Sequence, residues 1–532
     1  MKSSRSSLWL SLVLSASSGF LTAAEVGGKI GSLEELRDLR KQAAERQRRI
    51  IFNNDGNEPV YLCENTTAEE LLRHRTAALA GSKVDSLFYC TWSSGFGLFT
   101  HDTKVGQVFS TKEALFSKNK TPEMLAAGTD PLRVMTEFGH ANGMEVLWSF
   151  RLNDTHDGSG AAYGPVMFRA NRLKSEHPEW LISTKDVRPK FGAWSAVDFT
   201  HSEIRDLAFR YVEEVCQNYD VDGVEIDFFR HPVFFKRAAM TGTECTDEER
   251  TLMTGLIQRI RTMTEVEGMK RGRPILLAVR VPDSVAFCRA VGIDLENWLA
   301  GGLLDLLIVS GYFQLNDWDY SVELGHRYGV KVYPSLDESR VREEAARKLR
   351  SSIASYRGRA LNAWQAGADG LYLFNSFNPK SAIWTELSSS ALLTSLDHDY
   401  FASVRGLGAA AGGTFPHAGF LQIPDLNPAR PVALTPGGSV EVSFNVGDDV
   451  SAMSAAPTIQ LRLQFKALAS SEGLTVKLNG TELGEGSAKE QWLEFPVALQ
   501  DLKTGSNTVQ IQLSGESAAN ALTDLHCTLR YP

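Results

Sequence analysis

The chain has 532 residues, of which 43% are apolar and 22% are charged, and its formal net charge is -9. This length predicts two or more domains, because single hydrophobic cores rarely grow beyond about 250–300 residues. The acidic balance argues against nucleic acid as a partner, since phosphate recognition needs clustered Lys and Arg.

Residues 1–24 have the pattern of a secretory signal peptide. Lys2 and Arg5 precede an apolar run at 8–14, and small residues lead to a cleavage site expected after Ala24. The apolar run is too short to span a bilayer, and no later segment is apolar enough to do so. We therefore expect a bacterial protein that is secreted or periplasmic, with no membrane insertion.

Strand-like and helical patterns alternate over residues 25–400. The expected strands lie at 49–55, 84–91, 144–154, 221–229, 274–281, 303–313, 330–337 and 368–377. Helical periodicity fills segments between them, for example 203–219 and 343–367. Eight strands separated by crossovers predict an α/β fold, a (β/α)8 TIM barrel, over the alternative of an open doubly wound sheet. No GxGxxG turn follows the first strand, so we expect no dinucleotide, and we predict no cofactor.

The pattern changes after a Gly/Ala-rich linker at 401–416. Residues 417–532 show period-two alternation, as in "SVEVSFNV" and "NTVQIQL", and Asn479-Gly480 marks a hairpin turn. This predicts an all-β, jelly-roll-like sandwich domain, either carbohydrate-binding or a passive packing domain.

Polar, charged and aromatic residues gather where the predicted barrel strands end, while the strand bodies are apolar. Because TIM barrels place their chemistry at this face, the distribution indicates an enzyme or a binding cleft. Arginines there are consistent with an anionic sugar or with Arg–carboxylate pairs inside the site. The residues expected to bind substrate are Asn53, Trp92, Arg151, Asn153, Arg230, His231, Arg280, Tyr312 and Asn375.

The fourth predicted strand carries two acids, Glu225 and Asp227, on one face. Two carboxylates roughly 6.5–7 Å apart on a strand disfavour double ionisation, so one pKa should rise and that group could protonate a leaving oxygen. The alternative is a buried structural pair held by arginines.

Glycosidases use two carboxyl groups that flank the scissile bond, so a partner across the barrel is expected. Asp337, after the seventh strand, is our candidate, and a helix N-cap is its alternative interpretation. The histidines show no metal-ligand spacing, so we predict no metal.

"HPEWLIST" at 177–184 and "AVDFTHSEIRDLAFRYVEEVCQNYDVDGVEIDFFRHP" at 196–232 resemble the signature of the glycosyl-hydrolase-like 10 family. Asp222, Gly223, Asp227 and Pro232 match the motif, whereas Phe228 stands where the family often has a second Asp. The family often has His at the position of Glu225. The resemblance implies an exported barrel acting on glycans, with some members linked to bacterial cell-wall glycan strands. The C-terminal region is similar to galactose-binding-like sandwiches.

These patterns predict an exported glycoside hydrolase that acts on an oligo- or polysaccharide, such as a cell-wall glycan. Asp227 is the leading acid/base, Glu225 tunes it or positions the substrate, and Asp337 is the partner. The alternative, favoured by Phe228, is a non-catalytic glycan-binding protein with a degenerate barrel site. A third hypothesis is a cell-envelope assembly protein that uses the sandwich for protein contacts.

Overall fold

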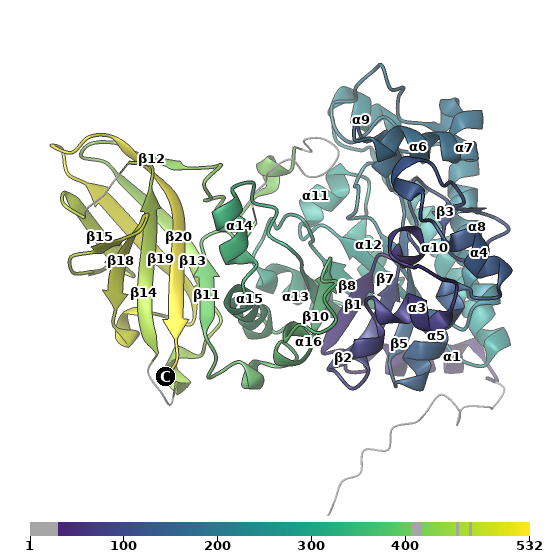
Figure 1. Cartoon of the computed structure of the whole chain (residues 1–532), viewed down its shortest axis with the longest axis horizontal. Coiled ribbons are helices and arrows are strands. Elements are labelled where there is room, and N and C mark those ends of the chain that lie inside the picture. Colours follow the sequence, from purple (N-terminus) through teal and green to yellow (C-terminus); the bar gives the residue numbers. More distant parts are fainter. Residues whose placement is uncertain (1–29, 406–415, 454–456, 468–470) are drawn as a thin grey trace, which may run out of the picture.

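The computed structural model describes residues 30–405, 416–453, 457–467 and 471–532. The expected signal peptide at 1–24 lies outside the described residues, as does most of the expected linker at 401–416. The chain forms a barrel with surrounding helices and, beside it, antiparallel sheets formed by the C-terminal region (Figure 1). None of the helices in the described ranges has the length and apolar character needed to cross a membrane.

Eight parallel strands close into a barrel in the order β1-β10-β9-β8-β7-β6-β5-β2, which confirms the predicted TIM barrel. Each strand falls within one of the eight predicted segments. They are β1 (Ile50–Asn54), β2 (Val84–Tyr89), β5 (Glu145–Arg151), β6 (Gly223–Asp227), β7 (Leu276–Val281), β8 (Leu306–Val309), β9 (Lys331–Leu336) and β10 (Leu371–Phe374). Their buried residues form one core with the surrounding helices.

Helices occupy the crossovers. A short two-stranded sheet of β3 (Leu98–Phe99) and β4 (Gln107–Val108) follows β2. The longer helices are α1 (Leu33–Ala44), α5 (Pro131–Ala141), α8 (Ser202–Asn218), α10 (Asp247–Arg271), α13 (Trp318–Arg327) and α15 (Ile353–Gln365). Helix α10 starts with a capping box, in which Thr246 and Glu249 satisfy each other's backbone N–H groups. It ends at Gly272, whose φ of 75° suits a residue without a side chain.

A repeated aspartate clamp joins neighbouring strands at the amino-terminal end of the barrel. In each case one carboxylate oxygen accepts the backbone N–H of a residue at the start of the adjacent strand. The contacts are Asp85 to Arg49 (2.7 Å), Asp222 to Val146 (2.8 Å), Asp305 to Leu277 (2.7 Å) and Asp369 to Val332 (2.8 Å). Buried amide groups are thereby satisfied where the strand ladder begins.

Two of these aspartates are followed by a glycine that the packing requires. A Cβ at Gly223 would lie 2.7 Å from the carbonyl oxygen of Leu276, and one at Gly370 would lie 1.8 Å from that of Arg48. Both glycines therefore allow adjacent backbones to approach closely. The Asp-Gly pair in "VDGVEIDFF" is accordingly part of the fold at this end of the barrel.

The C-terminal region forms two antiparallel sheets that share one core. One sheet contains β11 (His398–Phe401), β20 (Asn520–Arg530), β14 (Thr458–Phe465), β18 (Trp492–Val497) and β17 (Ser487–Lys489), with β12 (Val432–Leu434) also paired to β20. The other contains β13 (Ser439–Val446), β19 (Gly505–Leu513), β15 (Leu474–Leu478) and β16 (Thr481–Glu482). Strand β11 begins at His398, so this sheet takes most of its first strand from the segment that we expected to end the barrel domain.

Barrel and sandwich are joined by buried polar contacts. Arg350, at the end of α14 (Glu344–Arg350), donates two hydrogen bonds of 2.6 and 2.8 Å to Asp524 on β20. Both side chains are fully buried. Gly358 of α15 lies so close to β11 that a Cβ there would be 2.5 Å from the carbonyl oxygen of Asp399. The two parts therefore pack through matched surfaces.

Candidate active site

Strand β6 places both predicted acids toward the barrel interior, on the face opposite Val224, Ile226 and Phe228. Glu225 lies one layer below the strand ends, where its Oε2 accepts hydrogen bonds from Ser149 on β5 (2.5 Å) and Tyr372 on β10 (3.0 Å). Asn53 in turn donates to Ser149 Oγ at 3.2 Å. These contacts form a buried hydrogen-bond chain across the barrel.

The carboxyl group of Glu225 is fully buried, and this desolvation, together with the charge of Asp227, raises its pKa from an ordinary 4.5 to about 8. Glu225 is therefore protonated at neutral pH. The predicted rise of one pKa in the pair falls on the deeper of the two acids.

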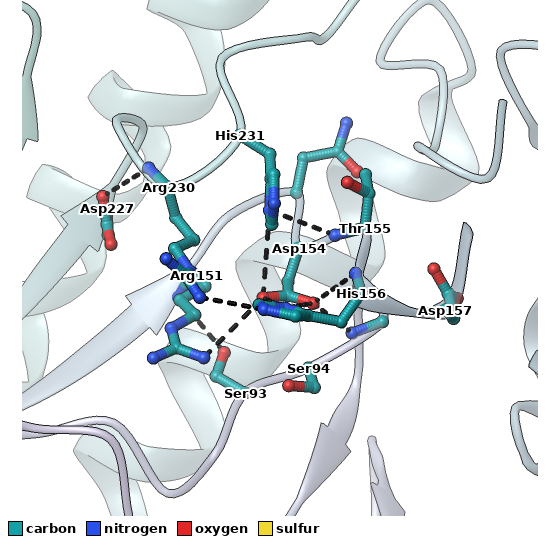
Figure 2. A network of polar contacts seen from close by, with 12 residues as sticks. Ser93, Ser94, Arg151, Asp154, Thr155, His156, Asp157, Asp227, Arg230 and His231 are labelled. Carbon is teal, nitrogen blue, oxygen red and sulfur yellow. Dashed lines mark hydrogen bonds and ion pairs between the residues drawn. The ribbon is translucent and has the colours of Figure 1, made fainter. Parts of the chain in front are cut away.

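Asp227 occupies the carboxyl-terminal end of β6. Its Oδ1 accepts the backbone N–H groups of Phe229 (2.9 Å) and Arg230 (3.0 Å; Figure 2). Its Oδ2 lies 3.5 Å from Nη1 of Arg280. Strand register places Arg151 and Arg280 directly beside it on β5 and β7. One oxygen is thus fixed by the backbone, and the other faces a guanidinium group.

Arg280 is fully buried but has few polar contacts. Its Nε donates to the carbonyl oxygen of Ser310 at 3.3 Å, and its guanidinium lies 4.0 Å from the ring centre of Phe374. Neither terminal nitrogen has a hydrogen-bond partner among the described residues. Burying such donors is costly unless a ligand satisfies them, which makes Arg280 a candidate substrate-binding group.

Arg151 and Asp55 form a buried ion pair at the mouth. Burial opposes the charge of Asp55, but Arg151 and then Arg230 outweigh this effect and lower the pKa of the Asp55 carboxyl. Asp55 lies at the end of β1, so it could exchange this partner for a substrate group without leaving the site.

A polar network that sequence reasoning missed lies beside these residues (Figure 2). Asp154 binds Nδ1 of His156 at 2.7 Å, and Arg230 donates to Nε2 of the same ring at 2.9 Å. His231 accepts the backbone N–H of Thr155 through Nδ1 at 3.2 Å. Burial lowers the pKa of His231, so its ring is neutral and carries its proton on Nε2.

The Asp154, His156 and His231 ligand atoms lie within 4.8 Å of one another, which is close enough to consider a metal ion. A cation there would meet the guanidinium of Arg151, 3.7 Å from Asp154, and that of Arg230 against His156. Two adjacent positive charges disfavour a divalent ion. We interpret the cluster as a hydrogen-bond network that orients Arg230.

Asp337 lies at the end of β9 and is fully buried against Arg405, with Nη2 to Oδ1 at 2.5 Å. Burial raises the pKa of Asp337 although Arg405 opposes this rise. Arg405 also donates to the carbonyl oxygen of Ser335 at 2.8 Å. The N-cap alternative for Asp337 is not what the structure contains, because the side chain of Glu343 caps α14.

The remaining predicted binding residues divide into two groups. Tyr312 lies between the guanidinium groups of Arg230 (4.9 Å) and Arg340 (4.1 Å), and its hydroxyl accepts a hydrogen bond from Asn375 at 3.4 Å. Tyr312 therefore lies beside Arg230, whose backbone N–H binds Asp227.

Trp92 and Asn153 have structural contacts instead. Trp92 is buried against Phe109, with ring centres 4.0 Å apart. The amide of Asn153 binds the backbone of Val197 and Val233. Both residues lie near strand ends as expected, and their side chains contact other parts of the fold.

Three strand ends carry a non-glycine residue with left-handed backbone geometry. The φ angles are 62° at Trp92 after β2, 69° at Ser310 after β8 and 57° at Asn375 after β10. Such strain is typical of functional sites, where the surrounding structure enforces it. It marks the carboxyl-terminal face of the barrel independently of the charges.

A (β/α)8 barrel that gathers acids, arginines and aromatic residues at this face has the architecture of a glycosidase-type protein. Residues 60–250 match the family model described as Glycosyl hydrolase-like 10, which confirms the predicted resemblance. The matched segment contains β2, β5 and β6, and therefore Arg151, Glu225 and Asp227.

Other comparisons are more distant, and no curated protein matches the chain. Similar solved structures include the cycloisomaltooligosaccharide glucanotransferase of Paenibacillus sp., with 10% identity, a TM-score of 0.33, and coverage of 90% of this chain and 57% of that one. The GH36 alpha-galactosidase AgaA from Geobacillus stearothermophilus has 12% identity, a TM-score of 0.37, and coverage of 88% and 56%. Chitinase ChiW from Paenibacillus sp. str. FPU-7 has 10% identity, a TM-score of 0.38, and coverage of 88% and 52%. The chain spans just over half the length of each of these structures.

Proposed function

We propose that this protein is an exported glycoside hydrolase that cleaves O-glycosidic bonds of a polysaccharide or cell-wall glycan, with Asp227 as the acid/base. The observation that carries the proposal is the pairing of Asp227 with a buried Arg280 whose terminal nitrogens have no hydrogen-bond partner among the described residues. The family match over 60–250 supports the class of reaction. Export rests on the signal pattern of residues 1–24.

Each group has a role that follows from its contacts. Glu225, protonated below Asp227, keeps a second negative charge out of the site and tunes its neighbour. Arg151, Arg230 and Arg280 bind substrate oxygens as charged donors. His231, Tyr312 and Asn375 extend the binding surface, and the Asp154–His156 pair orients Arg230.

Asp337 is the proposed second carboxyl group. In this conformation Arg405 holds it, so its participation requires Arg405 to release it when substrate binds. The free carboxylate would then face Asp227 from β9, on the other side of the mouth.

The experiment that tests the proposal is reducing-end release from a panel of cell-wall, plant and algal glycans, with wild type beside Asp227→Asn. We expect wild type to cleave at least one glycan and Asp227→Asn to lose a factor of about 10² or more in rate, the usual size of general acid–base catalysis. An active Asp227→Asn would contradict the assigned role.

A non-catalytic glycan-binding protein is the second candidate. It is favoured by the ion pair that occupies Asp337 and by the burial of Asp227, which is only 2% exposed. Glycan binding by both proteins without release of reducing ends by wild type would establish this alternative in place of the hydrolase.

A further inference from the structure

A polar cleft lies between the barrel and the sandwich. It has a cavity volume of about 260 Å³, and its lining comes from both parts of the chain, with Trp318 and Arg359 from the barrel and Phe401, Arg405 and Asn445 from the segments beyond it. This volume is below the range usual for drug-sized ligands and suits a ligand the size of one sugar ring.

Arg359 of α15 lines this cleft, and its positive charge is buried. The residue is 5% exposed, and neither terminal nitrogen has a hydrogen-bond partner in the described ranges. Its guanidinium lies 4.8 Å from the ring centre of Tyr356. Burying a guanidinium without polar partners costs free energy, so the site is suited to an anion that supplies two acceptor oxygens.

The nearby acid does not take this position. Asp337 binds Arg405 at 2.5 Å. Arg359 forms no ion pair with Asp337 in the described ranges, although its charge does act on this carboxyl group. Arg405 therefore holds the carboxylate on this side of the cleft, and Arg359 attracts it only from a longer distance. Arg357, two residues earlier on the same helix, is by contrast paired with Glu386 at 2.9 Å.

The rim of the cleft carries amides and acids, whereas its interior carries the guanidinium of Arg359. Asn362 has a buried side-chain oxygen without a partner among the described residues, and Gln365 and Gln422 are exposed amides at the opening. Asp317 and Asp319 also lie at the rim and are exposed. A ligand must therefore carry its negative charge toward Arg359 and present neutral hydroxyl groups to the rim.

One further acid, Asp425, lines the cleft and has its own partner, Arg430, at 3.7 Å. Aromatic side chains of Trp318 and Phe401 supply apolar surface beside the amides. Amides, one unpaired guanidinium and aromatic surface are the groups that recognise a sugar carrying a carboxylate.

We propose that this cleft is a binding site for a sugar acid, a uronic-acid unit free or at the end of a glycan, whose carboxylate binds Arg359. The cleft adjoins the barrel mouth, because Arg405 lines it and also binds Asp337. Ligand binding to Arg359 does not depend on the barrel being catalytic.

Isothermal titration of the full chain with D-glucuronate and D-galacturonate tests the proposal, with D-glucose, D-galactose and inorganic phosphate as comparison ligands. We expect a uronate to bind and the neutral sugars and phosphate to bind at least tenfold more weakly. Arg359→Gln should weaken uronate binding at least tenfold, whereas the matched control Arg357→Gln should leave it unchanged. A uronate-tipped oligosaccharide beside the free uronate distinguishes a glycan end from a monosaccharide.

Thermal unfolding without ligand provides a second readout. Because Arg359→Gln removes a buried charge without polar partners, its Tm should equal or exceed that of wild type, and uronate should raise the Tm of wild type alone. If Arg359→Gln does not fold, Asn362→Ala at the same cleft takes its place in the titration.

Several outcomes would overturn the proposal. These are the absence of uronate binding to wild type, equal binding of neutral sugars or phosphate, and uronate binding that survives both cleft substitutions. Loss of binding in Arg280→Gln but not in Arg359→Gln would assign the ligand to the barrel mouth instead. Because none of these readouts uses glycan cleavage, they are independent of whether the hydrolase proposal holds.

Discussion

The two ends of the barrel use the same kinds of residue in opposite ways. At the amino-terminal end, Arg48 donates to Glu145 through two nitrogens at 2.7 and 2.8 Å, and its remaining N–H groups bind three backbone carbonyls. At the carboxyl-terminal end, Arg280 is equally buried, yet its two terminal nitrogens have no hydrogen-bond partner among the described residues.

The aspartates at the two ends of β6 differ in the same way as these two arginines. Asp222, before β6, accepts hydrogen bonds from Val146, His140 and Arg273, so both its oxygens are occupied by groups of the fold. Asp227, at the other end of β6, has one oxygen held by backbone and one facing Arg280 across 3.5 Å. A buried charged residue therefore does not by itself mark a functional site in this molecule. The residues at the candidate site differ from the structural ones because some of their polar atoms have incomplete hydrogen bonding.

The largest effect is expected from breaking a saturated pair. Arg48→Met should lower the free energy of unfolding by about 3–5 kcal/mol, because Glu145 is left buried and unpaired. Arg280→Met should cost less, at most about 2 kcal/mol, since one contact at 3.5 Å and one backbone hydrogen bond are lost. Urea denaturation of both variants checks this. Equal losses would remove the distinction between the two ends.

Substitution of the two aspartates at opposite ends of β6 tests the comparison through enzyme activity. Asp227→Asn should reduce kcat/KM about 10²-fold or more, equivalent to about 2.7 kcal/mol or more, with a small change in Tm. Asp222→Asn should retain kcat/KM but lose about 1–3 kcal/mol of stability, because it weakens contacts to Arg273 and His140. Kinetics on the cleaved glycan and thermal unfolding separate the two. A stable but inactive Asp222→Asn would contradict the assignment of Asp222 to the fold.

The barrel was predictable because its signals are local. Each of the eight strands is a short apolar run bounded by a helical crossover, and strand β6 lies within the segment expected from "VDGVEIDFF". The gathering of Arg151, Asp227 and Arg280 also followed, since residues at the ends of neighbouring parallel strands must lie side by side.

Contacts between distant segments could not be predicted in this way. Asp154 and His156 directly follow β5, but their neighbour His231 comes from the loop after β6, so no spacing in the sequence marks the network. The partner of Asp337 is Arg405, which follows the first strand of the C-terminal sheet. The motif itself does not distinguish Asp222 from Asp227; only the direction of β6 in the barrel assigns one acid to each end.

The pH dependence of stability tests the incomplete pairing below Asp227. The pKa of Glu225 rises from 4.5 to about 8 on folding, so between these pH values the folded state holds a proton that the unfolded state has released. Stability of wild type relative to Glu225→Gln should therefore fall as the pH rises from about 4.5 to 8 and then level off, by at most about 1.4 kcal/mol per pH unit. Urea denaturation of both proteins at intervals from pH 5 to 8.5 measures this difference. A flat difference would mean that Glu225 is ionised in the fold.

The smallest effect concerns backbone strain at the mouth. Asn375 has a φ of 57° and makes one side-chain hydrogen bond, of 3.4 Å to Tyr312. Asn375→Gly should therefore raise stability by less than about 1 kcal/mol, because glycine adopts this geometry without strain, while KM rises as the amide is lost. Glu490→Gly is the control, since Glu490 has a φ of 56° in an exposed turn of the sandwich and should gain similar stability with unchanged kinetics. A KM change in Glu490→Gly, or none in Asn375→Gly, would show that strain at the strand ends is unrelated to substrate binding.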